Sequence, residues 1–517
     1  MTIFHPYRRL RTALVASAIS AALAGNAAAA PISWAGGDGA WENPLNWSGG
    51  VAPTAADFVE ILYTGAVSSG AAANTALELV SHAALTVGAG QLGVVGTVDS
   101  FGALAVEGGA SGAFGRVFVQ AAGALNVSGA GSTVSVVEGV FSSGNWQMSS
   151  GATLDAESFD NFNVQSLGGA AQATANSMIN HAGAVSSITG AGSRLVINGN
   201  LTNDGTVRAL AGGALETVSV DNFAGIEVDG GQYLSGSVDN HGSVVVRGAA
   251  GEWNATDVVT NAATVRVEAG AQADLATLDN LDSATIDGAS ARIGELDNRA
   301  AASLELASGA SATVVDLALN RGLLTIDANS VLASARYQQL AGATVLAGGE
   351  LGASEVFGVD IAGGELSGHG TIDGNLALGA GASLTPGDVA DATGRFDILG
   401  DLGLDGLFAV DIGGTDAADF DQLVASGNAM LGGTLAVSLA GSFMPVIGDY
   451  FDIVLAGAVG GDFDALALPT LSAGLRFETL VGADFYRLAI TAVPLPAPLL
   501  PVLAAVTLLA CRSRRRA

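Results

Sequence analysis

Asparagines occur at nearly regular intervals in the middle of this chain. Most of them are followed by a short run in which apolar residues occupy every second position. They recur about every 20 residues, at Asn161, Asn180, Asn203, Asn222, Asn240, Asn261, Asn280, Asn298 and Asn320. Ile226 and Val228 follow Asn222, for example, and Leu324 and Ile326 follow Asn320. Apolar side chains at every second position indicate strands with one buried face. Clusters of Gly, Ala, Asn and Asp between them indicate turns. Repetition of one strand unit predicts a solenoid.

We therefore predict an all-β fold, a right-handed parallel β-helix with a short β-rich C-terminal cap and one C-terminal transmembrane helix. With strands of successive coils about 4.8 Å apart, residues 80–440 would form about 18 coils, roughly 85 Å in length. A row of separate β-sandwiches is the rival architecture. Sandwiches need turn signals about every 8–12 residues and larger aromatic cores, whereas the small side chains of this chain suit a narrow stacked interior.

The asparagine column has a structural interpretation. In a tight turn between strands, Asn tolerates left-handed backbone angles, and its amide can form a hydrogen bond with the Asn one coil away. We expect the nine residues to form such a ladder. A ligand-binding role for the column is the alternative.

The N-terminus carries the features of a secretory signal peptide. Arg8, Arg9 and Arg11 form a basic segment, and an apolar run from Thr12 to Gly25 follows it. This run is shorter than the roughly 20 residues that a membrane-spanning helix needs. The small residues from Ala27 to Ala30 offer a cleavage site after Ala30. We expect the protein to be exported.

The C-terminus reads as a second targeting signal with three parts. The motif Val493, Pro494, Leu495, Pro496, Ala497 precedes an apolar run from Pro498 to Cys511, and a basic stop follows at Arg512, Arg514, Arg515 and Arg516. The apolar run would enter a bilayer, and the arginines would stay in the cytoplasm. The prolines keep the motif out of regular helix, so it stays extended for a processing enzyme.

This arrangement resembles the VPLPA variant of the PEP-CTERM sorting signals. The resemblance covers about a twentieth of the chain, and Leu495 stands where the parent family has Glu. It implies export in a Gram-negative bacterium, an inner-membrane-anchored precursor, and processing by an exosortase-type enzyme that leaves the protein at the cell surface or in the extracellular matrix. A plain C-terminal membrane anchor is the alternative.

Charge and cysteine content narrow the set of partners. All 19 basic residues are arginines, seven of them in the two targeting segments, so 12 remain against 49 acids. Nucleic acid is excluded as a partner, because binding it needs a basic face. The only cysteine, Cys511, lies in the C-terminal segment, so the exported body has no disulfide. An exported chain of this size must then rely on a large core or on repetition.

Two segments resemble parts of autotransporter-type passenger proteins. Residues 34–61, with Trp34, Trp41 and Trp47, resemble the opening motif of such passengers, and we expect the tryptophans to close the N-terminal edge of the solenoid. A sugar-stacking role for them is the alternative. Residues 366–439 resemble the last passenger coils, with Phe420 and the following residues as one motif. No translocating barrel pattern follows in the sequence given.

We searched the sequence for catalytic signatures and found no G-x-S-x-G, H-E-x-x-H, Walker or C-x-x-C motif. His82, His181, His241 and His369 are widely separated along the chain. We predict a non-enzymatic structural or adhesive protein of the surface or of a biofilm matrix, with exopolysaccharide or cell-surface glycans as candidate partners. The alternative is a β-helical polysaccharide lyase or hydrolase.

We predict no catalytic residues, cofactor or metal ligands, with calcium as the open alternative. Five aspartates precede asparagines of the column, and we expect them to stack on one outer edge: Asp160, Asp221, Asp239, Asp279 and Asp297. Calcium would relieve their repulsion; solvated turn aspartates are the simpler interpretation. The same two interpretations apply to a second acidic cluster at residues 388–421.

The predicted organisation has five parts. Residues 1–30 form the signal peptide, 31–79 the tryptophan-rich cap, 80–440 the β-helix, 441–492 the C-terminal cap, and 493–517 the sorting signal.

Overall fold

The computed structural model describes residues 31–70, 72–354, 356, 358–387 and 393–493. These residues form a parallel β-solenoid of about 17 turns with almost no helix. The one helical element that is described is a three-residue 3-10 helix, η1 (Pro44–Asn46). The all-β solenoid expected from the repeated strand pattern is confirmed. The chain divides into two units, residues 1–335 and 336–517.

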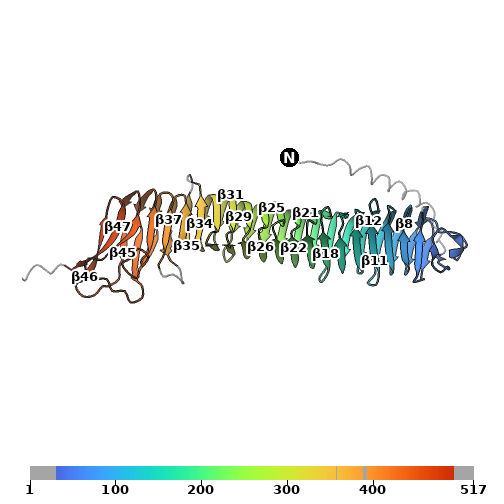
Figure 1. Cartoon of the computed structure of the whole chain (residues 1–517), viewed down its shortest axis with the longest axis horizontal. Coiled ribbons are helices and arrows are strands. Elements are labelled where there is room, and N and C mark those ends of the chain that lie inside the picture. Colours follow the sequence, from blue (N-terminus) through green and yellow to red (C-terminus); the bar gives the residue numbers. More distant parts are fainter. Residues whose placement is uncertain (1–30, 71, 355, 357, 388–392, 494–517) are drawn as a thin grey trace, which may run out of the picture. The chain divides into compact units, whose positions relative to one another are not determined.

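Most coils of the first unit consist of one long and one short strand, which Figure 1 shows stacked side by side. The long strands are β8 (Gln91–Ser100), β10 (Ser111–Val119), β12 (Thr133–Ser142), β14 (Thr153–Asn161), β19 (Arg194–Asn203), β21 (Ala214–Asn222), β23 (Gln232–Asn240), β25 (Glu252–Asn261), β27 (Gln272–Asn280), β29 (Ser290–Asn298) and β31 (Ser311–Asn320). In one coil the long strand is replaced by β16 (Gln172–Ala175) and β17 (Ser177–Asn180).

The short strands complete each coil. They are β9 (Ala103–Glu107), β11 (Ala124–Ser128), β13 (Asn145–Ser149), β15 (Val164–Leu167), β18 (Val185–Thr189), β20 (Thr206–Leu210), β22 (Gly225–Asp229), β24 (Ser243–Arg247), β26 (Thr264–Glu268), β28 (Ser283–Asp287), β30 (Ser303–Ala307) and β32 (Leu323–Asp327). Long strands pair in parallel with long strands, and short with short. Each coil therefore hydrogen-bonds to the coil before and after it.

Period-two burial explains why these residues form strands. In β26, Val265 and Val267 point inward and their neighbours face outward, and β24 repeats the pattern with Val244 and Val246. Many long strands bend in the middle, where the register between coils shifts by one residue, as between Ala255 and Val258. The bend lets one strand line two sides of the coil.

The inward residues fill a narrow core. Most are Leu, Val, Ile or Ala. The large buried rings include Tyr233 and Trp253, which stack on adjacent coils. Trp253 is fully buried, and the next residues in its inward column are Ala273, Ala291 and Ala312. A large side chain beside small ones keeps the interior filled at constant coil spacing.

The first unit begins with shorter strands: β1 (Ile32–Ser33), β2 (Gly39–Ala40), β3 (Phe58–Ile61), β4 (Ala66–Ser69), β5 (Ala73–Ala76), β6 (Glu78–Ser81) and β7 (Ala84–Val87). Trp34, Trp41 and Trp47 are buried here, with Trp47 edge-on to each of the other two at 4.8 Å between ring centroids. The Trp47 indole donates to the Trp41 carbonyl at 2.7 Å. Because these rings are covered, the sugar-stacking alternative finds no exposed ring face here.

The second unit also consists mainly of parallel strands, and its later coils contain three strands each. After β33 (Val331–Gln339), which contains the division between the units, come β34 (Ala343–Ala353), β35 (Val359–Asp373), β36 (Leu376–Pro386), β37 (Arg395–Ile398), β38 (Leu402–Leu404), β39 (Leu407–Ile412), β40 (Gln422–Ala425), β41 (Asn428–Leu431), β42 (Thr434–Leu439), β43 (Tyr450–Leu455), β44 (Ala458–Gly461) and β45 (Ala465–Ala467). β37, β40 and β43 stack in parallel.

The pairing direction changes at the end of the second unit. β47 (Phe485–Ala492) pairs antiparallel with both β43 and β46 (Leu475–Val481). Arg487 of β47 donates two hydrogen bonds, of 2.6 and 2.8 Å, to the carboxylate of Asp452 in β43. Among the described residues, none lies in a helix with the length and apolar character that crossing a bilayer requires.

Candidate functional site

The nine column asparagines lie at strand ends with their side chains buried inside the solenoid. Each is at most 2% exposed. The amide nitrogens of the first eight, from Asn161 to Asn298, each donate to the side-chain oxygen of the next asparagine at 2.7 or 2.8 Å, so that the series ends at Asn320. The result is a continuous hydrogen-bonded ladder in the interior of the first unit.

A second set of bonds ties the ladder to the backbone. The Asn261 amide also donates to the Ser283 carbonyl at 2.8 Å, and the Asn280 amide donates to the Ser303 carbonyl at 2.8 Å. Asn203, Asn222, Asn240 and Asn298 make the same kind of bond. Each of these six asparagines thereby links the end of a long strand to the first residue of a short strand one coil further on. A buried amide with all of these partners strengthens the contact between coils instead of costing desolvation energy.

The backbone explanation that we gave for the asparagines is wrong. None of the nine is among the described residues with positive φ, which are mainly Gly, together with Ala and Ser, and include Asn329. The asparagines are extended residues at strand ends, and the left-handed turns lie elsewhere, for example at Ala269 and Gly270. Asn occupies the column for its side-chain amide and not for its tolerance of left-handed angles.

The five aspartates before the ladder do face outward, but they do not form one continuous stack. Only Asp221 with Asp239, and Asp279 with Asp297, are direct neighbours on adjacent coils. Asp160 lies between Phe141 and Ile179, because the residue before the next asparagine is not an acid. The expectation of a single edge of five carboxylates is therefore wrong.

Arginines pair with two of these five aspartates, Asp279 and Asp297. Arg299 contacts Asp279 at 2.6 Å and Asp297 at 3.0 Å, and Arg321 reaches Asp297 at 2.8 Å. His241 lies 3.2 Å from Asp239. Asp297 therefore already has two cationic partners. Among the described residues, no group of three or more His, Cys, Asp or Glu side chains could hold a metal ion. Calcium binding stays an untested alternative to the prediction of no metal.

The histidines of the first unit pack against phenylalanines on the outer surface. His82 stacks on Phe101 with ring centroids 4.4 Å apart, and His181 stacks on Phe162 at 3.7 Å. The rings are nearly parallel and belong to adjacent coils, so each pair forms a short pile along the stack of coils. His369 lies in the second unit, in the lining of another hollow with Thr371 and Arg395. His241 of the first unit also stacks on a phenylalanine, Phe223, with ring centroids 5.4 Å apart. The described histidines are thus dispersed, and the three of the first unit serve as packing partners.

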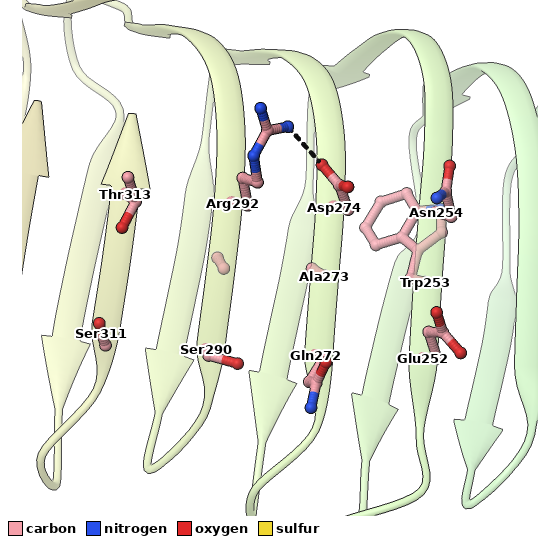
Figure 2. A pocket seen from close by; sticks show the side chains of 11 residues that line it. Glu252, Trp253, Asn254, Gln272, Ala273, Asp274, Ser290, Arg292, Ser311 and Thr313 are labelled. Carbon is pink, nitrogen blue, oxygen red and sulfur yellow. Dashed lines mark hydrogen bonds and ion pairs between the residues drawn. The ribbon is translucent and has the colours of Figure 1, made fainter. Parts of the chain in front are cut away.

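The first unit has a shallow hollow on the outer face of the sheet formed by the long strands. Figure 2 shows it between β25 and β31, with a volume of about 340 Å³. Its outward side chains are Glu252, Asn254, Gln272, Asp274, Ser290, Arg292, Ser311 and Thr313. Arg292 reaches across one coil to Asp274 at 3.1 Å, the dashed contact in Figure 2. The floor includes Trp253, Ala273 and Ala291.

The second unit contains a buried carboxyl group, that of Asp421, whose burial the sequence did not predict. Asp421 is fully buried, and its two oxygens accept backbone N–H bonds from Gly394 at 2.7 Å and Asp411 at 2.8 Å. Burial raises the pKa of this carboxyl to about 7, against the opposing effect of the two backbone donors. Asp421 thereby joins β39, which contains Asp411, to Gly394, the residue before β37.

The targeting segments fall almost entirely outside the described residues. This holds for the signal peptide with its cleavage position Ala30, for Pro494, Leu495, Pro496 and Ala497, for the predicted membrane segment, and for the stop at Arg512, Arg514, Arg515 and Arg516. Of the sorting motif, Val493 is described, and its N–H donates to the Gly474 carbonyl at 2.8 Å. The sorting signal stays a prediction.

Comparison with known proteins adds no assignment. No protein-family model matches the chain, and no curated protein matches it. The function of the protein is therefore inferred from its residues and its fold.

Proposed function

We propose that this chain is an exported, non-enzymatic protein of the cell surface or extracellular matrix of a Gram-negative bacterium, with a structural or adhesive role. The observation that carries the proposal is the buried asparagine ladder. Its side chains occupy the interior and hydrogen-bond each coil to the next. Such a stack presents long repeated outer faces and needs no disulfide, as a load-bearing or adhesive exported protein requires.

The proposal includes finer structural features. The solenoid is right-handed, because parallel strands joined by crossovers within one sheet take that hand almost without exception. Residues 441–492 form the C-terminal cap, supported by the antiparallel β46 and β47 that follow the last parallel coil. The segment after Val493 is a sorting signal with one transmembrane helix, read by an exosortase-type enzyme.

The alternative function is a β-helical polysaccharide lyase or hydrolase, and the hollow of Figure 2 is the observation that favours it. Glu252 and Asp274 lie on adjacent coils there. Glycoside hydrolysis uses two such carboxyl groups, one of them held protonated. Asp274, however, is already paired with Arg292.

Two measurements test the proposal. Cell fractionation of the producing bacterium should place the protein at the surface or in the matrix, and retention in the cytoplasm would exclude the proposal. Incubation of the purified protein with matrix polysaccharide should release neither reducing ends nor unsaturated uronides. Release of either product, lost on Glu252→Gln substitution, would establish the enzymatic alternative.

A further inference from the structure

The outward side chains of the hollow in Figure 2 form a regular polar grid. One column consists of Glu252, Gln272, Ser290 and Ser311, and the other consists of Asn254, Asp274, Arg292 and Thr313. Members of a column lie directly across from one another on adjacent parallel strands, about 4.8 Å apart. The four coils therefore span about 14 Å along the stack, with one pair of polar side chains per coil.

Much of the hydrogen-bonding capacity of this grid is unused. The side chains of Asn254, Gln272, Ser290, Ser311 and Thr313 make no hydrogen bond to another described residue. Glu252 accepts one long bond, 3.3 Å, from Gln232. Primary amides and hydroxyls both donate and accept, and the Arg292 guanidinium adds donors beside the Asp274 carboxylate.

The shape of the hollow follows from side-chain size. Ser290, Ser311 and Thr313 have short side chains, whereas Glu252, Gln272 and Arg292 have long ones, and all six line the hollow. Small residues under the strands, Ala273 and Ala291, remain slightly exposed at 4% and 6%. The same columns are filled differently one coil earlier, where Leu234 presents an apolar side chain.

Charge selects among ligands. The hollow carries two acids and one arginine in a chain of net charge −30. A polyanion would be repelled by this field. The grid contains no large apolar side chain pointing outward, and such anchors are what a protein partner would need.

We propose that this grid binds a linear, uncharged polysaccharide whose chain lies along the stack of coils. Glycan hydroxyls both donate and accept hydrogen bonds, and an extended glycan offers them at an interval close to the coil spacing, so successive sugars meet successive pairs of side chains. This inference rests on the proposed function, because it names the partner class of a surface or matrix protein.

Binding to uncharged oligosaccharides tests the inference. Mature protein from the producing cells would be titrated calorimetrically with β-1,4-linked hexamers of glucose and of N-acetylglucosamine, and with hexamannuronate as the anionic probe. We expect at least one uncharged hexamer to bind and hexamannuronate not to bind. The double variant Asn254→Ala with Gln272→Ala should weaken binding by about tenfold to a hundredfold, as expected for two lost hydrogen bonds.

A matched control lies on the same two columns outside the hollow. Gln172 and Thr174 occupy these columns on β16, and the double variant Gln172→Ala with Thr174→Ala should bind within about twofold of the parent. Circular dichroism would verify that both double variants are folded. Equal loss in the two variants, preferential binding of hexamannuronate, or no binding of either uncharged hexamer would each overturn the inference. Failure of binding by a protein that fractionates to the surface leaves the proposed function standing, whereas cytoplasmic retention removes both.

Discussion

Replacement of Asn261 by Ala removes the middle of the asparagine ladder. The amide nitrogen of Asn261 donates to Asn280 and to the Ser283 carbonyl, both at 2.8 Å, and its oxygen accepts from Asn240 at 2.8 Å. Each such bond contributes about 1 kcal/mol net, so we expect a loss of about 3 kcal/mol. The Asn280 oxygen would also lose its donor inside a buried site, which adds to the loss.

Matched variants separate the ladder from asparagine content. Asn163 lies in the outer turn, and its side chain makes only long contacts of 3.3 and 3.5 Å, so Asn163→Ala should cost less than about 1 kcal/mol. Asn261→Ser should recover part of the loss, because Ser142 occupies the same column and donates to the Gly144 carbonyl at 2.9 Å.

The assay must resolve local unfolding, since repeat proteins can open coil by coil. Urea unfolding followed by circular dichroism gives the overall change, and amide hydrogen exchange over β25 to β27 gives the local one. We expect protection to fall most in these strands for Asn261→Ala. If Asn261→Ala and Asn163→Ala cost the same free energy and lose protection equally, the ladder does not stabilise the stack.

Two further predictions concern the repeat and the buried acid. Deletion of residues 261–279, one full period, should leave a folded chain shorter by one coil, because Thr260 and Asp279 are register partners. Deletion of half that period should expose apolar side chains. If the two deletion variants give equal circular dichroism spectra and bind a hydrophobic dye equally, the solenoid register is contradicted. The pKa of Asp421 is raised from 3.8 to about 7 by burial, so the folded state binds its proton more tightly than the unfolded state, and this contribution to stability is lost as pH rises from about 4 to 7. In Asp421→Asn, denaturation midpoints measured across this range should depend less on pH, and an unchanged slope would contradict the assignment.

Much of the first unit could be predicted because its pattern is local. Apolar alternation after each asparagine identifies strands such as β26, and the inward asparagines repeat in the same strand position. The prediction of a continuous carboxylate stack was wrong, although the sequence already contains residues that interrupt it. Ile179, Thr202 and Thr260 precede their asparagines at the equivalent positions. These three residues leave gaps in the row of aspartates.

The polar hollow could not be predicted, because it depends on register across the bend of each long strand. Glu252 and Gln272 are partners, yet β25 has 10 residues and β27 has 9, and each strand ends at its ladder asparagine. Counting back from the asparagines therefore misaligns the two strands. The burial of Asp421 could not be predicted either, since its hydrogen-bond donors, Gly394 before β37 and Asp411 in β39, lie at different distances along the chain.

C-terminal mass spectrometry of the native protein, isolated from the surface or matrix fraction of the producing bacterium, tests the central claim most directly. The account predicts a mature chain that begins after Ala30 and ends in the neighbourhood of Val493–Ala497. A surface protein that retains Cys511 and the arginines from Arg512 to Arg516 would contradict it.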